Sequence, residues 1–117
     1  MRLKLPAIAL VLIALTLSVS PALSGSKLVV YTLKKAYEEG EVVTIVVKTS
    51  PWAEVGVEVI NPLMRTVYAD QGIANLTGMA TFRVLAVPDL WPPGKYVVYA
   101  STPGVYNTTT FSIVGPG

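Results

Sequence analysis

The chain has 117 residues, of which 52% are hydrophobic and 14% are charged, and it contains neither cysteine nor histidine. These absences exclude disulfides, zinc sites that need thiolate or imidazole, and catalytic centres of the Ser-His-Asp or Cys-His type. Arg2 and Lys4 account for the whole formal net charge of +2, because the remaining seven basic residues are balanced by seven acidic ones. The balance after residue 24 gives no support to nucleic-acid binding, which needs a clustered basic face.

Residues 1–24 have the pattern of a secretory signal peptide. Arg2 and Lys4 form a positive start, residues 5–19 are almost wholly aliphatic, and small residues follow Pro21. The pattern predicts cleavage after Ser24. An uncleaved signal anchor is the alternative, because about 20 uncharged residues can span a bilayer. Either interpretation predicts a domain at residues 25–117 that is secreted or held at the extracellular cell surface, with membrane contact only through residues 1–24.

After residue 26 the hydrophobic residues recur with a period of two, which is typical of strands with one buried face. Seven strands are predicted, at residues 27–33, 42–49, 54–60, 65–69, 79–87, 96–101 and 105–114. Residues 37–40 are expected to form a turn. Short alternating strands divided by Gly and Pro turns indicate an all-β fold, a seven-stranded antiparallel immunoglobulin-like β-sandwich preceded by an N-terminal hydrophobic signal helix.

The alternation also predicts which side chains fill the core. In the strand at 42–49, Thr44 and Val46 are expected on the outer face. Tyr96 follows a glycine and a lysine, and its hydroxyl is expected to fix the start of its strand, as the corner tyrosine of many sandwiches does. The side chains predicted to face inward are Val43, Ile45, Val47, Val55, Val57, Val59, Ala80, Phe82, Val84, Tyr96, Val98 and Ala100.

The acidic residues do not form a convincing catalytic pair. Glu54 and Glu58 point outward from one strand, and the other glutamates crowd one turn beside Lys34 and Lys35, where a solvated, self-compensating loop explains them. The sequence has no phosphate-binding loop and no dinucleotide fingerprint. We therefore expect a protein that is not an enzyme and has no catalytic residues, cofactor or metal site.

Two sequons could accept glycan in an exported protein. They begin at Asn75 (NLT) and Asn107 (NTT), and neither has proline in the middle. Both lie near predicted turns or strand ends, so both residues are candidate glycosylation sites.

Large apolar side chains in predicted loops form a candidate contact surface, made of Trp52, Leu63, Met64 and Trp91. Both tryptophans flank prolines at strand ends. A second interpretation therefore places them in the core or at its rim, where aromatic side chains bury the most area per residue.

Four short motifs resemble macroglobulin-like (MG2-type) immunoglobulin-like domains. They are YEEGEV at 37–42, NP at 61–62, GMATF at 78–82 and PGKYVV at 93–98, in the order of that family. Glu39 stands where the family has proline, and Leu63 and Met64 replace its turn glycine. The resemblance implies an exported single-domain sandwich. It does not carry over protease trapping, because the thioester of large macroglobulins requires a cysteine.

Two functions fit these observations. The first is an exported, non-enzymatic immunoglobulin-like module for interaction or adhesion, with a protein or cell-surface partner. The second is a self-assembling subunit of an extracellular filament or surface layer, in which residues 27–33 exchange between neighbouring copies by adding a strand to an open sheet edge.

Overall fold

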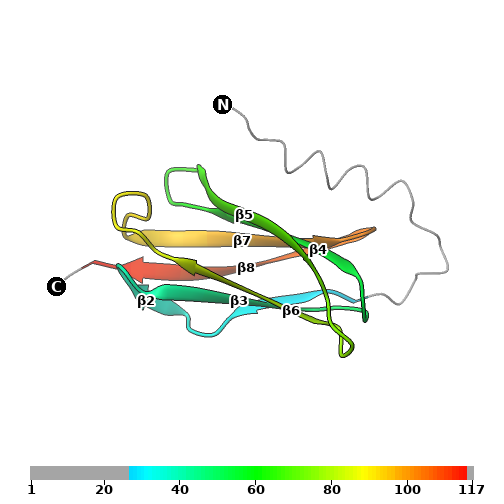
Figure 1. The fold of residues 1–117 in the computed structure, drawn as a ribbon. Helices are drawn as coiled ribbons and strands as arrows, with labels where there is room; N and C mark the ends of the chain where they lie inside the picture. The colour runs from blue at the N-terminus through cyan, green and yellow to red at the C-terminus, as the bar shows by residue number, and fades with distance from the viewer. Residues whose placement is uncertain (1–26, 116–117) are drawn as a thin grey trace.

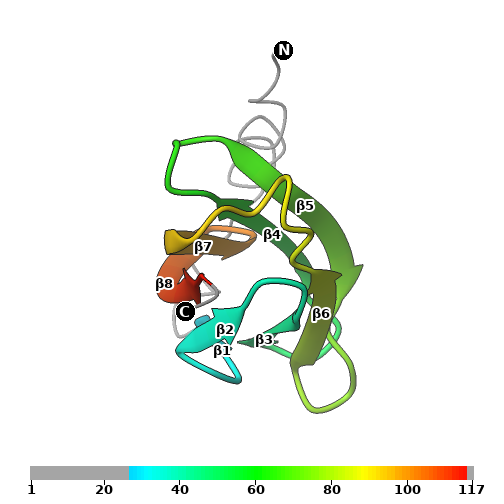
Figure 2. The ribbon, with the colours of Figure 1, turned by 90° about the vertical axis from the view of Figure 1, so that its left-hand side faces the viewer.

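The computed structural model describes residues 27–115, which form two facing β-sheets (Figures 1 and 2). The predicted signal segment and its cleavage point lie outside these residues. The strands are β1 Val29–Thr32, β2 Ala36–Glu38, β3 Val42–Lys48, β4 Glu54–Ile60, β5 Thr66–Ile73, β6 Met79–Leu85, β7 Gly94–Thr102 and β8 Val105–Val114. One sheet has the order β1-β3-β6 and the other the order β2-β8-β7-β4-β5. The all-β sandwich is confirmed, with eight strands in place of seven.

The eighth strand is β2, in the segment that was predicted as a turn. It pairs parallel with β8, with Tyr37 opposite Ile113. The turn prediction holds for Glu39 and Gly40, where Glu41 N donates to Glu38 O at 3.0 Å. It was wrong for residues 37 and 38, because Tyr37 is only 2% exposed and anchors the segment to the second sheet. Its ring packs edge-on against Phe111, and its hydroxyl accepts a hydrogen bond from Lys34 N at 3.1 Å. Lys34 in turn pairs with Glu41, which confirms the self-compensating charges of this loop.

Strand β5 is longer than predicted and includes the polar residues 70–72, which follow the strand predicted at 65–69. These residues stay in the strand because β5 is an edge strand, hydrogen-bonded to β4 alone, where polar side chains remain in solvent. On β3, Thr44 and Val46 lie on the face opposite the core residues Val43, Ile45 and Val47, as predicted, although their exposed fractions are only 9% and 5%. Strand β3 is the centre of its sheet, so side chains of both neighbouring strands flank these two positions: Tyr31 and Thr81 lie opposite Val46, and Arg83 lies opposite Thr44.

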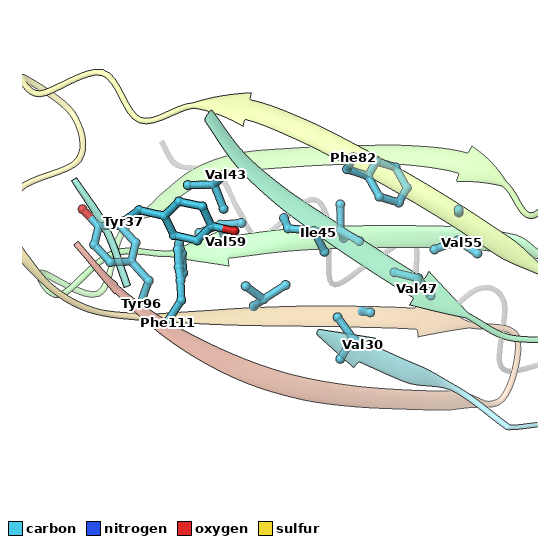
Figure 3. Close-up of a cluster of buried hydrophobic side chains, with 14 of the residues drawn as sticks. Val30, Tyr37, Val43, Ile45, Val47, Val55, Val59, Phe82, Tyr96 and Phe111 are labelled. Atoms are coloured by element: carbon cyan, nitrogen blue, oxygen red, sulfur yellow. The ribbon is translucent and has the colours of Figure 1, made fainter. Parts of the chain in front are cut away.

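The core lies between the sheets and is built from the alternating residues (Figure 3). The valines of β4 are at most 2% exposed, as predicted. At one end of the core, Tyr96 stacks on Trp91 with ring centroids 5.3 Å apart and approaches Phe111 at 5.1 Å. The Tyr96 hydroxyl donates to Pro92 O at 2.6 Å, which confirms its predicted role at the strand start. Burial raises the pKa of Tyr96 to about 12, with a smaller contribution from Glu39.

Candidate functional site

The turns gather at the two ends of the sandwich (Figure 1). At one end, which we call the Trp52 end, the β3–β4 turn (residues 49–53) and the β5–β6 turn (residues 74–78) are joined by backbone hydrogen bonds: Thr49 N to Gly78 O at 2.7 Å and Ala74 N to Ala53 O at 2.8 Å. Gly78 has φ +83°, and a Cβ there would lie 2.1 Å from Thr49 O, so the close approach requires glycine.

The β4–β5 turn (residues 61–65) lies at the other end, which we call the hairpin end. Asn61 builds this turn. Its side chain is 6% exposed, and its Oδ1 accepts hydrogen bonds from Leu63 N at 2.8 Å and Arg65 N at 3.0 Å. This is the Asx arrangement by which a short amide side chain replaces a missing backbone partner. The pyrrolidine of Pro62 lies against Gly94, where a Cβ would approach to 2.6 Å, so the turn is held firmly against the start of β7.

Two exposed apolar side chains project from this turn. Leu63 is 66% exposed and Met64 is 83% exposed. Met64 also has φ 66°, in the left-handed region, which costs a residue with a Cβ about 1–2 kcal/mol. The β6–β7 connection reaches the same end of the sandwich (Figure 1) and adds Leu90, which is 60% exposed. The hairpin end therefore presents apolar surface on a rigid turn.

The Trp52 end is also apolar. Trp52 is 64% exposed with φ 65°, and it accompanies Ile73 and Leu76, which are 63% and 69% exposed. The backbone N–H of Trp52 donates to Asn75 O at 3.3 Å, so the tryptophan and the first sequon are direct backbone neighbours. The interpretation that placed Trp52 in the core is wrong.

Trp91 is not part of any contact surface. Its side chain is 2% exposed, and it packs against Tyr96 and Phe111. The prediction that Trp91 belongs with Trp52, Leu63 and Met64 on the surface was wrong, and its packing in the core is confirmed. Both tryptophans stand next to a proline. Trp91 is buried because Tyr96 and Phe111, which come later in the chain, pack against it.

The two sequons have different environments. Asn75 lies in the exposed β5–β6 turn, and its Oδ1 accepts hydrogen bonds from Thr77 N, Thr77 Oγ1 and Met79 N at 2.9, 2.8 and 2.9 Å. Asn107 lies within β8, and its Nδ2 donates to Leu28 O at 3.0 Å. The sequence motif alone gives no sign of this difference.

Two acidic side chains on the described surface accept hydrogen bonds from neighbouring hydroxyl groups. Glu58 accepts a hydrogen bond from the hydroxyl of Thr66, and Asp70 accepts one from the hydroxyl of Tyr68 at 3.0 Å. Burial, followed by the contact with Asp70, raises the pKa of Tyr68 to about 12. Among residues 27–115 no helix is long and apolar enough to cross a membrane.

Comparison with known proteins relates the chain to a surface-layer protein. Over 110 residues it is 30% identical to S-layer protein B of Metallosphaera sedula, a match that covers 88% of this chain and 26% of that protein. The chain thus spans about a quarter of the length of this relative. No family model matches the chain, and the macroglobulin-like resemblance stays a prediction.

Two solved structures have a similar fold, and this similarity is evidence for the fold of the chain and for nothing more. The chain matches macromomycin with a TM-score of 0.56 at 12% identity, over 75% of this chain and 100% of that one. It matches a cycloisomaltooligosaccharide glucanotransferase of Paenibacillus sp. with a TM-score of 0.55 at 17% identity, over 73% of this chain and 13% of that one. At such low identity both support the sandwich and carry no functional assignment.

Proposed function

We propose that this chain is an exported, non-enzymatic module of a cell-surface layer, and that it acts through protein contacts at its hairpin end. The observation that carries the proposal is the similarity to S-layer protein B over 88% of the chain. Because the match covers only 26% of that protein, the shared part is one module, and its role in the layer has to come from its own surface.

The hairpin end has the properties of a contact surface. Leu63 and Met64 are exposed apolar side chains on a turn that Asn61 and Pro62 hold in place, so little conformational freedom is lost when a partner binds. Arg65 follows directly and is exposed, which adds a charged side chain to the rim. We take the partner to be another protein of the surface layer.

The experiment compares surface variants in cells of the source organism. The full chain is produced as wild type, as L63S/M64S and as the matched control Y106S. The amount of each protein is then measured in the envelope and medium fractions. Tyr106 is 70% exposed and adjoins the β7–β8 turn, so its loss removes a similar exposed side chain away from the hairpin end. We expect wild type and Y106S in the envelope, and L63S/M64S released into the medium. Retention of L63S/M64S in the envelope, or wild-type protein inside the cell, would contradict the proposal.

Self-assembly by strand exchange is the second candidate. Strand β1 has only four residues, pairs with β3 alone and forms the edge of its sheet, so it could leave and be replaced by the same strand of a neighbour. The exchange must break the hydrogen bond from Asn107 to Leu28 O and re-form it between copies. Light scattering on size-exclusion fractions tests it: large assemblies that vanish when residues 27–33 are deleted favour exchange, and a monomeric wild type rules it out.

A further inference from the structure

The fold presents the two sequons in different ways. Asn75 lies in the exposed β5–β6 turn, whereas Asn107 lies within β8, opposite Ala100 of β7 in the hydrogen-bonded ladder. An enzyme that modifies a sequon has to take up the asparagine amide together with the hydroxyl two residues later. A projecting turn can enter such a site, but a strand paired within a sheet cannot do so without unpairing.

At Asn75 the two groups already lie together. The hydroxyl of Thr77 is 2.8 Å from Asn75 Oδ1, and two further donors, Thr77 N and Met79 N, fix the carboxamide in the turn. All three hydrogen bonds use the oxygen. The amide nitrogen of Asn75 makes no hydrogen bond within residues 27–115, so the atom that would receive a sugar is left for reaction.

At Asn107 the amide nitrogen is occupied. Nδ2 donates to Leu28 O at 3.0 Å, a contact that joins β8 to the residue before β1. Its Oδ1 accepts from Thr108 N and makes no bond to the Thr109 hydroxyl within the described residues. Modification would require this link to break and β8 to leave its ladder with β7.

We propose that Asn75 carries an N-linked glycan in the exported protein and that Asn107 does not. The proposal rests on the export of the chain, and it assigns a polar covering to the Trp52 end. In the transfer, Asn75 Nδ2 forms a bond to C1 of a sugar held on a lipid diphosphate, and the bond from C1 to the phosphate oxygen breaks. The lipid diphosphate leaves with the electron pair, and the proton released from Nδ2 passes to a base of the transferring enzyme or to solvent.

The surroundings of Asn75 explain what the glycan does. Trp52, Ile73 and Leu76 are all more than 60% exposed around this turn, and the Trp52 N–H contacts Asn75 O directly. Exposed apolar side chains gathered at one place invite nonspecific association. A bulky, hydrated glycan on Asn75 shields them, which leaves protein contact to the hairpin end.

The test uses full-length protein recovered from the envelope or medium of its source cells. Glycopeptide mass spectrometry should find glycan on the peptide that contains Asn75 and none on the peptide that contains Asn107. T77A should abolish the modification and T77S should retain it, because serine keeps the hydroxyl of the sequon. T109A is the matched control at the other sequon and should leave the glycan unchanged.

Two results would overturn the proposal: glycan on Asn107, or exported wild-type protein with unmodified Asn75. The wild-type measurement needs no substitution, so it stands even if T77A weakens the turn. A failure of the glycan proposal can be distinguished from a failure of the proposed surface function. Unmodified protein in the envelope rejects the glycan and leaves the surface role intact, whereas protein found only inside the cell rejects both.

Discussion

Replacing Met64 by glycine should stabilise the domain relative to alanine at the same position. Met64 has φ 66°, where any residue with a Cβ carries a penalty of about 1–2 kcal/mol that glycine avoids. Against this, glycine loses about 0.5–1 kcal/mol more than alanine through backbone entropy. Taken at the middle of each range, the difference leaves M64G more stable than M64A by about 0.75 kcal/mol, and by about 1.5 kcal/mol at most.

The side chain itself contributes little to this comparison. Met64 is 83% exposed, and full burial of a methionine contributes about 1.5–3 kcal/mol. Its truncation to alanine therefore costs less than about 0.5 kcal/mol, and M64G should equal or exceed the wild type. For a domain of this size, 1 kcal/mol corresponds to a change in Tm of about 4–8 °C.

Thermal and guanidinium unfolding of wild type, M64G and M64A measure the effect. Leu63 provides the control, because its φ is not positive and the strain argument does not apply to it. L63G should be less stable than L63A by about 0.5–1 kcal/mol. If M64G proves less stable than M64A, or if both positions respond alike, the strain at Met64 is not real and the reasoning fails.

Three further predictions concern the core and the turn. W91A should lower the unfolding free energy by about 3–5 kcal/mol in denaturant titrations, because Trp91 is 2% exposed within an aromatic cluster. N61A should lower the unfolding free energy by about 2 kcal/mol in denaturant titrations, since two backbone N–H groups lose their acceptor. The pKa values of Tyr68 and Tyr96 are raised from 10 to about 12, so the neutral forms favour folding. This stabilisation is complete below pH 10 and is lost between pH 10 and 12; Y96F should unfold with a shallower dependence over that range.

Period-two alternation was sufficient to predict most strands and inward faces, because a half-buried strand imposes that pattern on its own residues. It was insufficient for β2, whose three residues are held by the contact of Tyr37 with Phe111, more than 70 positions later. Alternation also could not predict that Trp52 is exposed and Trp91 is buried. Each stands beside proline at a strand end, and only the packing of Tyr96 and Phe111 against Trp91 decides which one is buried.

The backbone strain at Met64 supports a surface role for the hairpin end independently of the comparisons. Among the described residues, six have positive φ, and four of these are glycines, as expected where a Cβ is penalised. The two exceptions, Trp52 and Met64, flank the same strand β4, and both have large apolar side chains that are mostly exposed. Stability alone would favour glycine at both places. An exposed side chain contributes little to folding, so the strained position of Met64 favours a contact outside the domain at the hairpin end, whereas Trp52 lies at the other end, beside Asn75.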